Sequence, residues 1–338
     1  MENNMIQLPE SLDGKTILVA GAAGFIPHTL SEFYLKLGAS VIGVDNFITG
    51  SRSNLDKLYP YKKFEFFEAN IYEDLPDFKN RSIDYIFSLA SPASPIDFEK
   101  IPLEIMRVNS EGTLNLLNLA REKGARFLEA STSEVYGDPE IHPQTEDYFG
   151  HVNPIGPRSC YDEAKRYAEA LTMSYHRKYG VDTRIIRIFN TYGPGMRPND
   201  GRVIPNFINQ ALTGQDITVY GDGSQTRSFC YVTDLVNAIH NVMFSDDPTP
   251  FNVGNPDEYT IKECAEEIIT FLGSTSRIKY LPIGEDDPKR RRPSLGKLQS
   301  ISNYKPQVSF REGIQKTAAY FRDLAQIQGR NDFKQPNL

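Results

Sequence analysis

The chain has 338 residues and a formal net charge of −7, and 39% of its residues are hydrophobic. At roughly 100 to 200 residues per domain, this length predicts two lobes with enough apolar material for a core, which excludes a mainly disordered chain. The negative charge gives no electrostatic reason to expect a nucleic acid or an anionic membrane as partner, so local cations would have to hold any anionic ligand.

Cysteine usage and hydropathy exclude two further classes. Cys160, Cys230 and Cys264 are far apart, odd in number and without CxxC spacing, which argues against a disulfide framework and a zinc site. The first residues lack a basic start followed by an apolar stretch, and no run approaches the ~20 apolar residues of a membrane span. We therefore expect a cytoplasmic protein.

Apolar runs alternate with helical patterns through the first half of the chain. The run 15–20 is followed by a helix with one apolar face, and this alternation continues. Together these elements predict an α/β fold with a Rossmann-type, doubly wound parallel sheet. Further strands are predicted at 40–44, 64–68, 83–90, 126–131 and 183–189, and further helices at 103–123 and 160–179.

After position 190 the pattern loosens into segments rich in Gly and Pro. We interpret 14–190 as the doubly wound domain and 191–328 as a smaller C-terminal α/β lobe, with 228–258 returning to the first domain. An arm at 1–13 and a loose tail at 329–338 complete the chain. Helices of the second half are predicted at 203–213, 233–244, 260–272 and 311–327.

The stretch GAAGFIPHTL lies where the first strand meets its helix. Gly21 and Gly24 suit the tight turn of a dinucleotide loop, and Asp45 ends the second strand at about the 20-residue offset of the carboxylate that binds the adenosine ribose. Such a carboxylate favours NAD over NADP, whose phosphate it would repel. A glycine match alone would leave open an ordinary strand–turn–helix without a ligand.

Pro27 stands where the GxxGxxG spacing has its third glycine. It falls in the first helical turn, where a backbone N–H has no intrahelical partner to lose, so we do not expect it to break the helix. The amides around Gly24, Phe25 and Ile26 would bind phosphate at the positive helix end. We expect a loop that is altered but still binds the cofactor.

The stretch YDEAK places Tyr161 and Lys165 on one face of a helix. A phenol is a poor base at neutral pH, and a neighbouring ammonium together with a cationic nicotinamide favours its phenolate. Tyr and Lys at this spacing also arise by chance as a surface pair. Here a second polar cluster, STSEVYG at 131–137, follows a predicted strand at its carboxyl end, where such folds place their sites.

Over nearly its whole length the chain resembles the extended short-chain dehydrogenase/reductases of the NAD-dependent epimerase/dehydratase family, and among them the UDP-glucuronate decarboxylases, also called UDP-xylose synthases. The stretches that carry the resemblance, besides STSEVYG, are SLASPASP, VNSEGTLNLL, HPQTEDYFGHVNPIGPRSCYDEAKR, RIFNTYGP, DGRVIPNFINQAL, DGSQTRSFCYVTDLV and DDPKRRRP.

This resemblance implies roles for individual residues. Tyr161 would take the proton of the sugar 4-hydroxyl, while Lys165 lowers the pKa of Tyr161 and binds the nicotinamide ribose. Thr132 would hydrogen-bond the same hydroxyl, and Glu134 with Ser133 would serve the steps at carbons 5 and 6. The cofactor residues it implies, besides Tyr161 and Lys165, are Gly21, Gly24, Phe25, Ile26, Asp45, Asn70, Ile71, Leu89, Ala90 and Asn109. The substrate residues are Ser91, Pro92, Glu134, Asn190, Arg197, Arg227 and Arg291, whereas Lys289, Arg290 and Arg292 are expected to be solvated surface charges.

The implied reaction is NAD-dependent decarboxylation of UDP-glucuronate to UDP-xylose through a 4-keto intermediate, with NAD recycled. The 4,6-dehydratases of nucleotide sugars are an alternative, but they carry an Asp–Glu pair where this chain has Ser133–Glu134. The 4-epimerases usually lack an acid at position 134. A non-catalytic, NAD-binding regulatory protein would be expected to have lost Tyr161 or Lys165. The resemblance also implies a homodimer formed through helices 103–123 and 160–179.

Four positions depart from the family pattern: Pro27, Ser88, Gly195 and Ser294 stand where Gly, His, Arg and Asp are usual. An arginine at 195 could help hold the substrate. Its absence could mean another sugar, a stalled 4-keto product, or compensation by Arg197. The five histidines lack metal-ligand spacing, so we expect no metal and place each of them on a loop or helix surface: His28, His142, His151, His176 and His240.

Overall fold

A parallel sheet of seven strands forms the centre of the computed structural model, which describes residues 5–282 and 290–327. The strand order is β11-β6-β5-β4-β1-β2-β3, and all neighbouring pairs are parallel. The predicted doubly wound sheet is therefore confirmed. The strands are β1 (Thr16–Ala20), β2 (Ser40–Asp45), β3 (Phe64–Glu68), β4 (Tyr85–Ser88), β5 (Arg126–Thr132), β6 (Thr183–Ile188) and β11 (Phe251–Val253).

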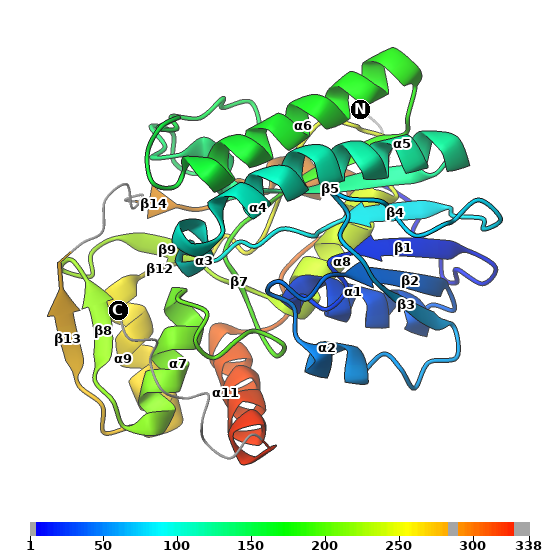
Figure 1. The fold of residues 1–338 in the computed structure, drawn as a ribbon. Coiled ribbons are helices and arrows are strands. Elements are labelled where there is room, and N and C mark those ends of the chain that lie inside the picture. The colour runs from blue at the N-terminus through cyan, green and yellow to red at the C-terminus, as the bar shows by residue number, and fades with distance from the viewer. Residues whose placement is uncertain (1–4, 283–289, 328–338) are drawn as a thin grey trace.

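Helices cover both faces of this sheet (Figure 1). One face carries α4 (Pro102–Arg107), α5 (Thr113–Lys123) and α6 (Ser159–Tyr179), and the other carries α1 (Phe25–Lys36) and α8 (Val232–Met243). Each face buries its own hydrophobic cluster against the apolar strands, as expected for a parallel sheet that is covered on both sides.

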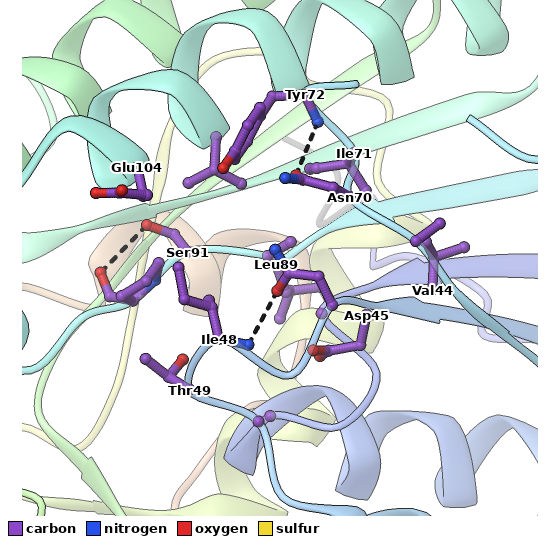
Figure 2. A pocket seen from close by; sticks show the side chains of 18 residues that line it. Val44, Asp45, Ile48, Thr49, Asn70, Ile71, Tyr72, Leu89, Ser91 and Glu104 are labelled. Atoms are coloured by element: carbon purple, nitrogen blue, oxygen red, sulfur yellow. Dashed lines mark hydrogen bonds between the residues drawn. The ribbon is translucent and has the colours of Figure 1, made fainter. Parts of the chain in front are cut away.

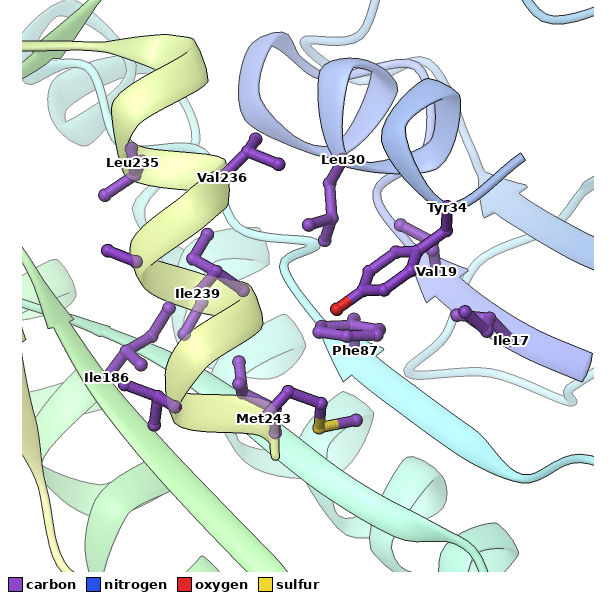
Figure 3. Packing of buried hydrophobic residues seen from close by; sticks show 14 of the residues in the cluster. Ile17, Val19, Leu30, Tyr34, Phe87, Ile186, Leu235, Val236, Ile239 and Met243 are labelled. Carbon is purple, nitrogen blue, oxygen red and sulfur yellow. The ribbon is translucent and has the colours of Figure 1, made fainter. Parts of the chain in front are cut away.

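The cluster under α1 and α8 joins distant parts of the chain (Figure 3). Tyr34 of α1 reaches the ring of Phe87 on β4, with ring centroids 5.2 Å apart. Leu235 and Ile239 of α8 belong to the same cluster. Together α8 and β11 bring part of the later chain back to the large sheet.

The predicted helix 103–123 is not one regular helix. A π-helical turn, Val108–Gly112, separates α4 from α5. Within it, Asn109 Nδ2 donates 2.8 Å hydrogen bonds to the Ile105 carbonyl and to Ser91 Oγ. Such turns occur frequently at functional sites, and the hydropathy pattern could not show this one because the residues on either side keep a helical period.

The second half of the chain encloses another hydrophobic cluster, between α7 (Val203–Thr213), α9 (Ile261–Leu272) and α11 (Phe310–Ile327). These helices and α8 confirm the four predicted there. The structure adds short elements that the sequence analysis did not predict: helices α2 (Arg52–Asp56), α3 (Pro95–Lys100) and α10 (Gly296–Ile301), and strands β7 (Thr191–Tyr192), β8 (Ile217–Tyr220), β9 (Thr226–Ser228), β10 (Cys230–Tyr231), β12 (Glu258–Thr260), β13 (Ile278–Leu281) and β14 (Arg290–Arg291).

Parts of the predicted organisation lie outside the described residues, namely 1–4 of the arm, Lys289, and the tail at 329–338. Within the described residues, no helix is both long and apolar enough to cross a membrane. All three cysteines are free and buried.

Candidate active site

A cavity of about 550 Å³, open to solvent, lies at the carboxyl ends of β1, β2 and β4 (Figure 2). Ligands of doubly wound sheets bind at this edge, where the chain leaves neighbouring strands in different directions. The structure brings together here nine residues that the sequence analysis selected: Gly21, Gly24, Asp45, Asn70, Ile71, Leu89, Ala90, Ser91 and Pro92.

The glycine loop approaches the β4 loop so closely that it needs glycine. Gly21 has a φ of +83°, and a Cβ there would lie 2.8 Å from Ala90 Cα. After Gly24, helix α1 begins at Phe25 and continues through Pro27. The expectation that Pro27 leaves the helix intact is therefore confirmed.

Asp45 is fixed at the end of β2 by backbone amides. Its carboxylate accepts hydrogen bonds from Ala23 N at 3.0 Å and Phe47 N at 2.7 Å. Burial raises the pKa of Asp45, while these amides favour the charged form. A carboxylate held beside a close-approach glycine loop is the arrangement that binds an adenosine ribose and diphosphate. The residues of this cavity therefore fit NAD.

Besides Tyr161 and Lys165, which are described below, three predicted cofactor residues do not line the cavity with their side chains. Asn109 is buried behind Ser91, whose hydroxyl it holds. The side chains of Phe25 and Ile26 pack against the hydrophobic clusters, so only their backbone remains for a phosphate.

Tyr161 lies in the first turns of α6, buried against α3 and β5. Its ring stacks on Phe98, with centroids 4.9 Å apart and planes at 19°. Burial raises the pKa of Tyr161 well above its usual value, and a hydrogen bond from Thr132 opposes that rise. Without ligands the phenol is therefore protonated, and forming the phenolate requires added positive charge.

The ammonium of Lys165 is held by strand β5. Its Nζ donates to the Ala130 carbonyl at 2.7 Å and pairs with Glu129 Oε1 at 3.3 Å. Burial lowers the pKa of Lys165, and Glu129 raises it. The sequence analysis missed Glu129 because its position within a predicted strand indicated only a sheet residue.

Glu134 lies between two arginines just after β5. Its carboxylate accepts a hydrogen bond from Arg158 Nη2 at 2.7 Å and another from Arg291 Nη1. These two guanidinium groups lower the pKa of Glu134 to about 2, against the effect of burial. The sequence analysis missed Arg158, although it stands in the stretch that matches the family, three residues before Tyr161.

A second carboxyl group, Asp162, lies beside the half-buried Glu134 and is itself buried. Burial raises the pKa of Asp162 to about 7, and the negative charge of Glu134 adds to the rise. The site therefore combines one carboxylate that stays ionised with one that changes its charge near neutrality. Pairs whose environments separate their pKa values are typical of acid–base sites.

The predicted substrate arginines fall into two groups. Arg227 and Arg291 are register partners on β9 and β14, and both are buried. Arg197 instead lies in a separate loop, where its Nη2 pairs with Asp97 at 2.6 Å. Asn190 is half-buried beyond the end of β6, and Ser133 is buried in the 3₁₀ turn Ser133–Tyr136 after β5.

His28 explains why position 195 carries glycine. A Cβ on Gly195 would lie 2.1 Å from His28 Cε1, and the φ of Gly195 is +100°. The expectation that every histidine lies on the surface is wrong for His28 and His240, which are both buried. His28 packs beneath the 195 loop, and His240 packs among aromatic rings of α1 and α8.

The basic residues Arg290–Arg292 differ in burial, because successive side chains of strand β14 point to opposite faces. Arg290 is exposed, as expected, whereas Arg291 is buried. Arg292 is half-buried. Its backbone N–H donates a hydrogen bond to Gln144 Oε1 at 2.8 Å. Ser294 binds the same segment through its backbone, with N–H donating to the Gln144 carbonyl at 2.8 Å.

Residues 17–254 match the NAD dependent epimerase/dehydratase family. The chain belongs to this family. Its cofactor is NAD, in agreement with the cavity described above. No group of three or more His, Cys, Asp or Glu side chains in the described part of the chain is arranged to hold a metal ion.

Relatives and solved structures cover nearly the whole chain. UDP-glucuronic acid decarboxylase 1 of Danio rerio is 48% identical over 321 residues, which span 95% of this chain and 76% of that protein. An epimerase from Methanothermobacter thermautotrophicus is 31% identical, with a TM-score of 0.86, over 94% of this chain and 95% of its own. UDP-glucuronic acid 4-epimerase from Bacillus cereus, solved with UDP-glucuronic acid and NAD, is 26% identical with a TM-score of 0.82, over 91% and 99%.

Proposed function

We propose that this enzyme decarboxylates UDP-glucuronate to UDP-xylose, using NAD that is regenerated in each turnover. The observation that carries this proposal is the cluster of Thr132, Tyr161, Glu134 and Arg291 beside the cofactor cavity. Relatives that are 45–48% identical to this chain over 90–95% of its length are named UDP-glucuronic acid decarboxylases.

NAD supplies the reversible oxidation of carbon 4 of the sugar. Tyr161, held by Thr132, takes the proton of the 4-hydroxyl, and Lys165 supplies positive charge that favours the phenolate. After oxidation, the carboxylate on carbon 5 is β to a ketone. Its electrons can enter an enolate as carbon dioxide leaves, and Tyr161 with Thr132 hydrogen-bonds the enolate oxygen.

Glu134 and the arginines act on the other side of the sugar. Arg291 and Arg227 hold the anionic groups of the substrate, and Arg158 keeps Glu134 in place. Glu134 serves the steps at carbons 5 and 6. Because it stays ionised, it would orient the water that protonates carbon 5, and solvent would replace the proton that this water gives up. The glycine loop and Asp45 would hold the reduced cofactor, whose hydride reduces carbon 4 and completes UDP-xylose.

Epimerisation at carbon 4 is the second candidate, because the solved neighbours include 4-epimerases. The ion pair between half-buried Glu134 and buried Arg291 favours decarboxylation, since 4-epimerases usually lack an acid at this position. We assign the NAD-binding Rossmann domain to 14–190, with 228–258 returning to it, and the sugar-nucleotide-binding lobe to 191–328.

The proposal includes a cytoplasmic homodimer. Apolar side chains on α4 and α6 are exposed, among them Leu103 at 68% and Tyr167 at 51%, and a second copy would cover them. Three buried, free cysteines suit a reducing compartment.

The test is incubation of the purified protein with UDP-glucuronate and NAD⁺, measuring released carbon dioxide and the mass of the product. Loss of the carboxyl group with a UDP-pentose product supports the proposal. Conversion to UDP-galacturonate without carbon dioxide would replace it with epimerisation, and no conversion would exclude this substrate.

A further inference from the structure

A buried carboxylate lies under the active-site lysine. The side chain of Glu129 on β5 is only 1% exposed and that of Lys165 only 4%. Central strands of parallel sheets normally carry apolar residues, and a buried charge is costly unless it is paired. Glu129 Oε1 lies 3.3 Å from Lys165 Nζ, so its position calls for a role that involves this lysine.

We propose that Glu129 is a positioning residue, whose carboxylate fixes the Lys165 ammonium against β5 and keeps it cationic when the cofactor is bound. This inference rests on the proposed function, in which the charge of Lys165 favours the phenolate of Tyr161. Glu129 acts through Lys165 and is not expected to touch the sugar.

The hydrogen bonds of Lys165 support this role. An ammonium has three N–H donors. Glu129 Oε1 and the Ala130 carbonyl accept two of them, the latter at 2.7 Å, which leaves one in a fixed direction for a ligand. The same strand ends in Thr132, which hydrogen-bonds Tyr161. One strand therefore positions both members of the Tyr161–Lys165 pair.

The surroundings leave Glu129 as the main counter-charge. Glu169 of α6 also acts on Lys165, but its carboxylate pairs with Arg187 of β6 at 2.8 Å and accepts a hydrogen bond from Ser131. Burial raises the pKa of Glu129, whereas the charge of Lys165 and the hydroxyl of Ser88, its register partner on β4, favour the charged carboxylate. Ser88, which stands where the family usually has histidine, is therefore part of the polar group formed by Glu129 and Lys165.

The sign of the effect follows from charge. Burial alone disfavours the ammonium, and a bound nicotinamide cation disfavours it further, whereas the Glu129 carboxylate favours it. In Glu129→Gln, Lys165 should lose its proton at a lower pH. An opposite charge at this distance shifts a titration by roughly 1 to 3 pH units.

We would measure NADH affinity by NADH fluorescence, and kcat/KM with UDP-glucuronate, as functions of pH. We expect the wild type to lose NADH affinity at alkaline pH, as Lys165 loses its proton. Lys165→Met should lack this pH-dependent loss, which would assign the loss to Lys165. In Glu129→Gln the loss should begin roughly 1 to 3 pH units lower than in the wild type. Glu146→Gln is the matched control, because that half-buried carboxylate accepts the Asn252 N–H at 2.9 Å and is not among the groups that shift the pKa of Lys165.

Glu129→Asp keeps the charge, so its NADH profile should stay closer to the wild type. An unshifted profile in folded Glu129→Gln would overturn the inference. So would a shift in Glu129→Asp or Glu146→Gln as large as that in Glu129→Gln, or an alkaline loss that persists in Lys165→Met. The NADH measurement needs no sugar substrate. A shifted NADH profile without decarboxylation would therefore refute the proposed function and leave the role of Glu129 supported.

Discussion

Gly195 and His28 share one small volume, so that a Cβ on Gly195 would lie 2.1 Å from His28 Cε1. His28 is anchored by a 3.0 Å contact from Nδ1 to the Gly24 carbonyl, and Asn54 Nδ2 donates to the Gly195 carbonyl at 3.2 Å. The absence of an arginine at 195 is thus linked to the histidine that follows Pro27.

We predict that Gly195→Ala lowers the free energy of unfolding by about 2 to 4 kcal/mol, since it combines a positive φ with overlap against His28. Gly214→Ala is the control, because Gly214 has a φ of +68° but no atom within 4 Å of a Cβ. His28→Ala should recover part of the loss at 195. Urea unfolding that gives equal costs at 195 and 214, or additive effects at 28 and 195, would contradict this explanation.

The buried histidines should make folding stability depend on pH. Burial lowers the pKa of His28 and of His240 from 6.5 to about 4. Between these values the unfolded chain binds more protons than the folded one, so stability is full above about pH 6.5 and falls as the pH drops towards about 4. Each histidine should remove roughly 2 kcal/mol between about pH 7.5 and about pH 5.

Urea unfolding at both pH values tests this expectation. His28→Ala should reduce the pH-dependent loss by about half, because His240 remains. The exposed His151 provides the control, and His151→Ala should keep the wild-type loss. A wild-type stability that is unchanged at the lower pH would argue that both histidines are protonated within the fold.

Tyr161 and Glu134 should affect different steps. We expect Tyr161→Phe to abolish oxidation of carbon 4, because the phenol that Thr132 hydrogen-bonds is the proposed acceptor of the 4-hydroxyl proton. Glu134→Gln should leave oxidation more intact than the later steps. Single-turnover absorbance of reduced nicotinamide, together with carbon dioxide release, separates the two. Equal loss of both signals in the two variants would refute this division of roles.

Arg291 and Arg290 are neighbours with opposite environments, one buried against Glu134 and one exposed. Removing one partner of a buried charge pair commonly costs about 2 to 5 kcal/mol, so Arg291→Gln should lower kcat/KM for UDP-glucuronate by roughly 30-fold or more. Arg290→Gln should change it by less than about 2-fold. Similar losses of kcat/KM in the two variants would argue that Arg291 does not act in the active site.

The sequence predicted what depends on local pattern. The alternation of strand and helix patterns predicted the parallel sheet, and the YDEAK and STSEVYG stretches indicated Tyr161, Lys165 and Glu134. Contacts between distant segments could not be predicted in this way. Arg291 is 157 residues away from Glu134 and Glu129 is 36 away from Lys165, and no spacing rule connects them.

The errors have a similar cause. A histidine in a polar stretch resembles a surface residue until its neighbours are known, and the 195 loop that covers His28 comes from a segment far away in the sequence. The π-helical turn depends on the side chain of Asn109, which takes the Ile105 carbonyl as its partner. Hydropathy does not report either arrangement.

Strand β5 carries Glu129, Ala130 and Thr132 between two parallel neighbours, β4 and β6. Because successive side chains of a strand point to opposite faces, a slip of one residue would turn Glu129 away from Lys165 and replace it with an apolar neighbour. A misregistered sheet could still be compact but would be inactive. For this enzyme, the yield of correctly folded molecules is therefore better counted by activity than by compactness or helical content.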